Sequence, residues 1–244
     1  MHLRRITLHP DKYPVTDHYP FNQPILRDTT QISFTSPVTF FVGENGTGKT
    51  TLLEAITRKC GIHIWRGAER GRYEVNPYDD QLYRYITVEW ENGMVPGSFF
   101  GSDTFRYFTH SLDEWASVDS RILKYFGGES LVTKSHGQSI MAYFRSRYQI
   151  VGLYILDEPE TALSPKSQLW LVRILREMGN AGHAQFIVAT HSPILLACPE
   201  AHILSFDTVP IRRVLYRDTD YYRLYKKFMD NPDKYVAGSI ADGR

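Results

Sequence analysis

The chain carries an eight-residue glycine-rich segment whose residue types and spacing could hold a phosphate. Residues 43–50, Gly-Glu-Asn-Gly-Thr-Gly-Lys-Thr, fit the pattern G-x-x-x-x-G-K-[ST] in full. Glycines let the backbone wrap closely around a phosphate, and the dipole of a following helix favours the same negative charge. We expect Lys49 to reach the β- and γ-phosphates of ATP, Thr50 to ligate Mg²⁺ and Thr51 to contact the α-phosphate. The expected nucleotide-binding residues of this segment are Gly43, Asn45, Gly46, Thr47, Gly48, Lys49, Thr50 and Thr51.

Two adjacent carboxylates, Asp157 and Glu158, follow an apolar run at residues 151–156. Such a run is typical of a buried strand, and ligands of open α/β sheets bind at the carboxyl ends of the strands. We expect Asp157 to hold Mg²⁺ through its water shell, so that Thr50 and Asp157 form the metal site. Glu158 is placed to polarise the attacking water as a general base.

His191 follows a second apolar run, at residues 184–189. A histidine at the end of a buried strand could hydrogen-bond the γ-phosphate or the catalytic water. The chain has nine histidines, and this placement distinguishes His191 from the others. The expected catalytic residues are therefore Lys49, Glu158 and His191.

These side chains must be positioned by strands that alternate with helices. Such alternation predicts an α/β protein with a mostly parallel sheet and flanking helices. Residues 103–126 are expected to be mostly helical, within a helical subdomain at residues 60–148. The helix at the C-terminal end should be capped by Asp218, Thr219 or Asp220. Strands are expected at residues 3–8, 31–34, 38–42, 84–90, 151–156, 184–189, 201–206 and 211–216, and helices at 50–59, 139–148, 165–178, 193–197 and 218–230.

The composition is that of an ordinary soluble protein of 244 residues, 42% hydrophobic and 23% charged. The net charge of +1 gives no support for a nucleic-acid partner, although it does not exclude a local basic patch. Neither a run of about 18 apolar residues nor the apolar core of a signal peptide occurs, so we expect a cytoplasmic protein without direct membrane insertion. The two cysteines, Cys60 and Cys198, lack the spacing of a zinc site.

Residues 135–139, Ser-His-Gly-Gln-Ser, resemble the signature motif of ABC-type ATPases, whose usual form is Leu-Ser-Gly-Gly-Gln. Ser135, Gly137 and Gln138 match, and His136 replaces the first glycine. The resemblance implies that Ser135, Gly137 and Gln138 contact the γ-phosphate of ATP held by a partner subunit. It therefore implies a head-to-tail homodimer with ATP at the interface.

The segment at residues 160–165 resembles the part of ABC enzymes that touches the partner subunit, with Ser164 in place of the usual aspartate. The whole chain is similar to small, stand-alone bacterial predicted ATPases related to the RecF, SMC and OLD nuclease heads. This implies a single ABC-type P-loop domain over residues 1–244, with a core at 1–59 and 149–244 and an insert at 60–148 that carries the signature. Residues 51–134 contain no heptads, so no coiled-coil arms are expected.

Three assignments stay open on the sequence. The loop that senses Mg²⁺ and nucleotide could lie at residues 99–106, with Ser102 or Asp103 as the sensor, or it could use Gln81. Tyr19 or Phe21 could stack on adenine, or could pack in the ordinary way. The Tyr-rich segment at residues 221–235 could dock a partner or pack on the chain's own sheet.

The expected function is that of an ATPase, converting ATP and water to ADP and phosphate, whose ATP-dependent dimer switches an unknown effector protein. An ATPase subunit of a membrane transporter is one alternative. A nucleic-acid-linked or antiviral-defence module is another, and a nucleotide-binding scaffold without activity is a third.

Overall fold

The fold is built on a six-stranded sheet with the strand order β5-β6-β7-β3-β8-β9. The computed structural model describes residues 1–66, 76–126, 128, 130–132 and 136–237. All neighbouring strands from β5 to β8 pair in parallel, and β9 pairs antiparallel with β8. The strands of this sheet are β3 (Val38–Val42), β5 (Gly97–Gly101), β6 (Gly152–Asp157), β7 (Ala184–Ala189), β8 (His202–Ser205) and β9 (Arg212–Val214).

The central strands are apolar on both faces because each face is covered. In β3, Phe40 is in one hydrophobic cluster and its neighbour Phe41 in the other. The same alternation separates Leu156 from Ile155 in β6. Successive side chains of a strand point to opposite faces, so a sheet between two layers needs apolar residues at consecutive positions.

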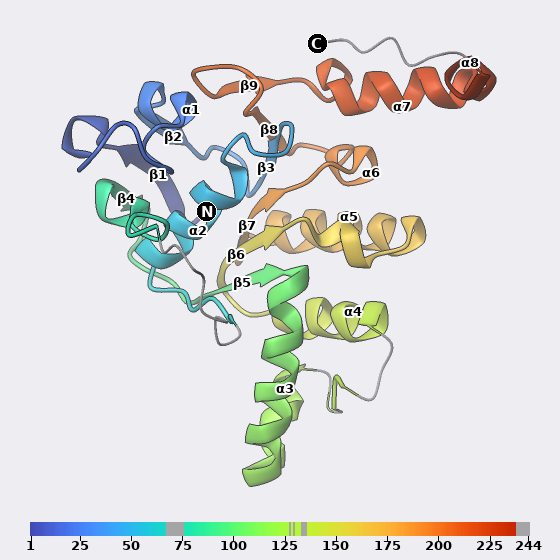
Figure 1. Cartoon of the computed structure of the whole chain (residues 1–244). Coiled ribbons are helices and arrows are strands. Elements are labelled where there is room, and N and C mark those ends of the chain that lie inside the picture. The colour runs from blue at the N-terminus through green and yellow to red at the C-terminus, as the bar shows by residue number, and fades with distance from the viewer. Residues whose placement is uncertain (67–75, 127, 129, 133–135, 238–244) are drawn as a thin grey trace.

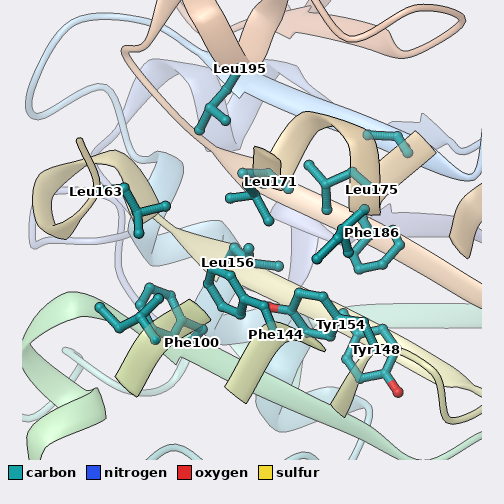
Figure 2. Close-up of a cluster of buried hydrophobic side chains, with 14 of the residues drawn as sticks. Phe100, Phe144, Tyr148, Tyr154, Leu156, Leu163, Leu171, Leu175, Phe186 and Leu195 are labelled. Carbon is teal, nitrogen blue, oxygen red and sulfur yellow. The ribbon is translucent and has the colours of Figure 1, made fainter. Parts of the chain in front are cut away.

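One face of the sheet is covered by helices, as Figure 1 shows. Figure 2 shows Phe144 of α4 and Tyr148, which directly follows α4, beside Tyr154 of β6, with Leu171 and Leu175 of α5 above them. Tyr154 is buried but polar at its tip, and its hydroxyl lies within hydrogen-bond distance of two acceptors, the carbonyl oxygens of Arg147 and Ile150. The helical elements of this layer are α3 (Ser102–Val118), the 3₁₀ helix η3 (Ser120–Phe126), α4 (His136–Arg147), the 3₁₀ helix η4 (Pro159–Ala162), α5 (Pro165–Asn180) and α6 (Pro193–Leu196).

The other face carries α2 (Lys49–Lys59) and a small antiparallel sheet of order β2-β1-β4. Gln185 of β7, which is fully buried, joins the two sheets. Its Oε1 accepts from the backbone N–H of Leu3, and its Nε2 donates to the Leu3 carbonyl. A buried amide must find such partners, which fixes β1 against β7. The remaining elements here are η1 (Pro10–Lys12), α1 (Pro24–Asp28), β1 (Leu3–Leu8), β2 (Gln31–Ser33), η2 (Leu82–Tyr85) and β4 (Ile86–Trp90).

β5 is a strand that the sequence analysis did not predict, because Gly97–Gly101 contains only two large apolar residues. It pairs with β6 along its whole length, from Gly97 opposite Leu153 to Gly101 opposite Asp157. Only glycine fits at position 97, since a Cβ there would lie 2.4 Å from the Leu153 carbonyl oxygen. The segment at residues 60–148 thus contributes one strand to each sheet besides its helices, and its treatment as a separate insert stays a prediction.

The C-terminal part of the described chain forms η5 (Tyr216–Asp218), α7 (Asp220–Asp230) and α8 (Pro232–Ala237). Thr219, one of the three expected caps, accepts from the backbone N–H of Tyr222 through its side chain. α7 runs along the upper edge of the molecule in Figure 1. Nowhere in the described residues is a helix both long and apolar enough to span a bilayer.

Candidate functional site

The expected site residues gather where β3, β6 and β7 end. β3 runs into the glycine-rich loop, β6 ends at Asp157, and β7 ends just before Thr190 and His191. The register places Asp157 directly beside Ala189. Because all these strands are parallel, their carboxyl ends meet at one edge of the sheet, which is where open α/β sheets bind ligands.

The conformation of the glycine-rich loop depends on two glycines that no other residue type could replace without strain. Gly48 has a φ of 94° as it enters α2, a left-handed conformation that other residues rarely adopt. Gly43 has a φ of 155°, and a Cβ there would lie 2.9 Å from the Cβ of Phe206. Asn45, Gly46 and Thr47 lie between these two glycines, and the Thr47 hydroxyl donates to the Glu44 carbonyl at 2.9 Å.

The Lys49 side chain lies inside the loop and hydrogen-bonds to the loop backbone. Its Nζ donates to the carbonyl oxygens of Gly43 at 2.6 Å and Glu44 at 2.8 Å, and the side chain is 5% exposed. Burial lowers the pKa of the Lys49 ammonium, while the nearby carboxylates of Glu158 and Asp207 act in the opposite direction. A poorly solvated cation at a helix N-terminus is well placed to gain from an arriving phosphate.

Thr50 and Asp157, the two expected metal ligands, lie together. The Thr50 hydroxyl donates to Asp157 Oδ1 at 3.2 Å. Burial raises the pKa of Asp157 to about 7, and the Glu158 and Glu54 carboxylates add to this effect. An Mg²⁺ ion fits a hydroxyl and a carboxylate oxygen, and it would favour the ionised carboxylate. The described residues contain no group of three or more His, Cys, Asp or Glu side chains that could hold a metal ion by themselves, so phosphate oxygens and water would have to complete the ion's shell.

Glu158 adopts a left-handed backbone conformation, with φ 45° and ψ 54°. Such a conformation is strained for a residue with a side chain, and it persists only where the surroundings hold it. Here the backbone N–H of Glu158 donates to the Ala189 carbonyl at 3.0 Å. The carboxylate is half-buried, and its Oε1 lies 3.2 Å from Nε2 of His191. The structure therefore brings together the expected general base and the expected histidine.

His191 is held by two residues that the sequence analysis did not select. Its backbone N–H donates to Glu160 Oε1 at 2.6 Å. Its Nδ1 lies 2.6 Å from the Tyr221 hydroxyl, which also lies 3.1 Å from the Gly43 carbonyl oxygen. Burial raises the pKa of both the Glu160 carboxyl and the Tyr221 phenol, so the phenol keeps its proton near neutral pH.

Asp207 is a third residue of the site that the sequence analysis missed. It follows β8, and its Oδ1 accepts from the backbone N–H of Glu44 at 2.8 Å. No local motif marks Asp207. Tyr221 begins the Tyr-rich segment at residues 221–235, but nothing in that segment indicated the phosphate loop, which both residues meet only through the fold. Glu160, by contrast, lies in a segment that the resemblance had already singled out.

A cavity of about 730 Å³ adjoins the start of α2. Tyr19, Thr51 and Gln81 line it. The Tyr19 hydroxyl hydrogen-bonds the Thr51 hydroxyl, and the side chain is 39% exposed, so Tyr19 remains available to an adenine ring. Phe21 is not available, because it is fully buried and its ring packs against Tyr13, Tyr78 and Tyr85.

The two candidates for the sensing loop occupy different places. Ser102 begins α3 directly after Gly101, which pairs with Asp157, so it stands beside the metal-ligand strand. Gln81 lies in the cavity by α2, where its Nε2 donates to the Pro77 carbonyl. The position of Ser102 favours residues 99–106 over Gln81 as the loop that senses Mg²⁺ and nucleotide. The side chain of the other candidate, Asp103, is outside what the structure describes.

Of the expected signature residues, Gly137 and Gln138 lie away from the chain's own phosphate loop. Ser135 lies outside the described residues. Gly137 and Gln138 lie in the first turn of α4, which packs on α5, η3 and η4. Among the described contacts none joins them to Lys49, and β7 lies between β6 and β3 in the sheet. They line a groove of about 950 Å³ between α4 and α5. Ser164, which stands where ABC enzymes usually have aspartate, caps α5 by accepting from the Ser167 N–H.

Comparisons with known proteins match two segments of the chain, which contain residues 43–50 and residues 157–191. Residues 21–63 match the family described as "AAA domain", and residues 138–197 match "AAA domain, putative AbiEii toxin, Type IV TA system". The chain is 40% identical over 101 residues to the OLD nuclease of Thermus scotoductus, covering 41% of this chain and 17% of that protein. It is 25% identical over 192 residues to ABC transporter G family member 4 of Arabidopsis thaliana, covering 69% of this chain and 31% of that protein. This chain thus matches less than a third of the length of either relative.

The fold is similar to that of cbiO1 from Clostridium perfringens, described as part of the ABC transporter complex cbiONQ. The TM-score is 0.51 at 14% sequence identity, and the match covers 95% of this chain and 97% of that one. This likeness concerns the fold alone. It confirms the predicted α/β fold class, with a mostly parallel sheet and flanking helices.

Proposed function

We propose that this chain, an ABC/AAA-type ATPase by its family matches and its fold, binds ATP with Mg²⁺ and hydrolyses it to ADP and phosphate. The observation that supports this most directly is the meeting of Lys49, Asp157 and Glu158 at one edge of the sheet. In this proposal the loop N–H groups and Lys49 bind the β- and γ-phosphates. Thr50 and Asp157 would hold the Mg²⁺ ion, whose charge would help to neutralise the charge that develops on the phosphates.

The water would be activated between Glu158 and His191. Their side chains lie 3.2 Å apart, so one water molecule could contact both. Glu158 would accept its proton as the bond to the γ-phosphorus forms. The half-buried position of Glu158 limits competing solvent and leaves an opening for the nucleotide.

We also propose that the active form is a head-to-tail dimer, in which α4 of one chain completes the site of the other. Gly137 and Gln138 support this, because they lie at a helix N-terminus away from their own phosphate loop. Helix N-termini bind phosphate through free N–H groups and the helix dipole. ATP would then join two chains and hydrolysis would release them, and an effector protein could respond to the difference.

The test is the mass in solution of the Glu158→Gln protein, measured by light scattering with and without ATP and Mg²⁺. Glutamine keeps the size of the side chain and a polar contact with His191 but cannot take a proton. Hydrolysis should fall by at least about 100-fold, so ATP should accumulate at the interface. The mass should rise from 28.2 kDa for one chain to about twice that value only when ATP is present.

Glu177→Gln is the matched control, because Glu177 is exposed on α5 and touches no site residue in the described contacts. It should hydrolyse ATP like the wild type. A Glu158→Gln protein that binds ATP but keeps the mass of one chain would contradict the dimer. A protein that fails to bind ATP would contradict the whole proposal.

A second candidate role, linked to nucleic acid, is favoured by the 40% identity to the OLD nuclease. If it holds, double-stranded DNA should stimulate ATP hydrolysis, and the effect should weaken steeply between 50 and 200 mM salt as counterions compete. A rate that DNA does not change at low salt would remove this candidate.

A further inference from the structure

Tyr221 connects two parts of the site that lie far apart in the sequence. It stands in the first turn of α7 and contacts Nδ1 of His191 at 2.6 Å and the carbonyl oxygen of Gly43 at 3.1 Å. The imidazole and phenol rings lie nearly perpendicular, with 5.1 Å between their centres. One hydroxyl therefore reaches both the catalytic histidine and the phosphate loop.

The phenol has a single proton, so it can donate to only one of these two acceptors at a time. If it donates to Nδ1, the neutral imidazole carries its own proton on Nε2 and donates it to Glu158. If it donates to Gly43, its oxygen must accept from Nδ1–H, and Nε2 of the neutral ring is then an acceptor. The acceptor to which the Tyr221 hydroxyl donates thus determines which ring nitrogen of His191 carries the proton.

The Gly43 carbonyl also accepts from the Lys49 ammonium. A bound ATP phosphate would compete with this carbonyl for the ammonium. Lys49 Nζ donates to the carbonyl oxygen at 2.6 Å, which is shorter than the 3.1 Å contact from Tyr221. With Lys49 in this place the carbonyl already has a close charged donor, and the 2.6 Å contact to Nδ1 favours donation of the phenol proton to His191 over the longer contact to Gly43. When Lys49 turns to a phosphate, the carbonyl loses its charged donor, and an unpartnered buried carbonyl is unfavourable.

We propose that Tyr221 is a positioning residue that couples phosphate binding at Lys49 to the tautomer of His191. In the nucleotide-free protein, Tyr221 donates to Nδ1 and His191 holds its proton on Nε2. With ATP bound, Tyr221 donates to Gly43, His191 holds its proton on Nδ1, and Nε2 faces the active site as an acceptor. Nε2 and Glu158 then form a pair of acceptors for the two O–H groups of one water.

The inference rests on the proposed ATPase function, and it adds the reason why His191 becomes ready for water only when phosphate is present. The change of tautomer leaves the number of protons in the site unchanged, because one proton binds to Nδ1 of His191 as another leaves Nε2. This exchange passes through solvent or the attacking water. Burial raises the pKa of the phenol, so Tyr221 acts as a neutral donor throughout.

The decisive measurement is the ¹⁵N chemical shift of the two His191 ring nitrogens, in protein labelled at histidine. The His191→Gln variant identifies the His191 signals among the nine histidines. The wild type should show the Nε2–H tautomer without nucleotide and the Nδ1–H tautomer with a non-hydrolysable ATP analogue and Mg²⁺. In Tyr221→Phe, which retains the ring and removes the hydroxyl, the tautomer should no longer change on binding.

The matched control is Tyr222→Phe, the same substitution one residue further along α7. The Tyr222 ring packs on Tyr216, 4.7 Å away between centres, and on the Lys226 ammonium. This variant should switch like the wild type. In steady-state assays Tyr221→Phe should lower kcat by about 10- to 100-fold, as for residues that orient a functional histidine, while analogue affinity changes less than about 3-fold.

Each outcome separates the inference from the proposed function. Titration calorimetry on the same samples measures analogue binding, and failure to bind would reject the ATPase proposal and with it this switch. Binding without a change of tautomer in the wild type would overturn the switch and leave the ATPase proposal intact. An unchanged switch in Tyr221→Phe would show that another group sets the tautomer.

Discussion

The phosphate-loop region and the α4 region differ in how much of a nucleotide site each completes within one chain. The phosphate-loop region, residues 43–50 with Asp157, Glu158 and His191, is joined by hydrogen bonds among its own members. The α4 region, Gly137 and Gln138 with the groove between α4 and α5, packs on neighbouring helices and reaches none of them in the described contacts. In the described residues, the phosphate-loop region joins its expected site residues within one chain, whereas the α4 region lies apart from them.

From this difference we expect the two regions to respond differently to mutation. Changes in the phosphate-loop region should act on nucleotide binding and chemistry in each single chain. Changes at α4 should act only when two chains meet. Four predictions test this contrast, taken from the largest expected effect to the smallest.

The largest effect is expected for Lys49→Ala. It removes the only side-chain cation that the described contacts place inside the phosphate loop. Loss of a charge-assisted hydrogen bond corresponds to roughly 1.5–3 kcal/mol, so ATP affinity should fall by about 100-fold, as measured by calorimetry. Lys59→Ala, at the other end of α2, should bind like the wild type. Equal affinities of the Lys49 variant and the wild type would mean that the loop does not bind phosphate as proposed.

The next effect concerns Gly137→Asp. A Cβ at Gly137 would lie 3.5 Å from the Ala162 carbonyl, an ordinary contact, so the fold should tolerate the change. The new carboxylate should repel a partner's γ-phosphate and reduce hydrolysis by about 100-fold, as loss of a transition-state donor does. ATP binding to one chain should not change. Gln149→Glu, at the other end of the same groove, is the control for added negative charge.

Mixing the two inactive variants sharpens the contrast. A heterodimer of Lys49→Ala and Gly137→Asp chains has one intact composite site, with the loop from one chain and α4 from the other. Hydrolysis should therefore return partly on mixing, in proportion to the amount of heterodimer. If neither variant restores the other while both remain folded, the two regions do not act across an interface.

The smallest effect is on stability and concerns Asp157→Asn. The pKa of Asp157 is raised from 3.8 to about 7, so between these pH values the folded chain binds more protons than the unfolded chain. Its stability contribution is thus present at low pH and lost as the pH rises towards 7. Above pH 7 the buried charge destabilises the metal-free protein, and Asn removes it. The variant should be more stable by about 1–2 kcal/mol, with a Tm higher by several degrees.

This stability difference should shrink to near zero below pH 4, and ATP with Mg²⁺ should raise the Tm of the wild type more than that of the variant. Asp119→Asn is the control, since Asp119 is exposed and its pKa is lowered by Arg121 rather than raised. A metal-free Asp157→Asn protein that melts below the wild type at pH 8 would contradict a buried, unfavourable charge at this position.

Local signals predicted which residues meet at this edge of the sheet, because each signal lies within a few consecutive residues. The glycine-rich loop, the acidic pair and His191 all follow apolar runs, and such runs predict buried strands whose ends lie at one edge. The strand-helix alternation predicted the fold class for the same reason. The sequence did not predict β5, since Gly97–Gly101 becomes a strand only by pairing with β6 over fifty residues away. Local propensity is weak in a strand that short.

What the sequence predicted by itself is therefore the set of residues expected to bind phosphate and metal or to act on water: the loop at residues 43–50, Asp157, Glu158 and His191. What only the tertiary structure decided is which residues join them: Tyr221 from α7, Asp207 after β8, and the burial of Phe21 that leaves Tyr19 as the aromatic open to a base. The physical reason is the separation, along the chain, of the groups that interact. A motif binds through groups that neighbouring backbone atoms hold, whereas a hydrogen bond between Tyr221 and Gly43 exists only after the chain has brought two distant segments into contact.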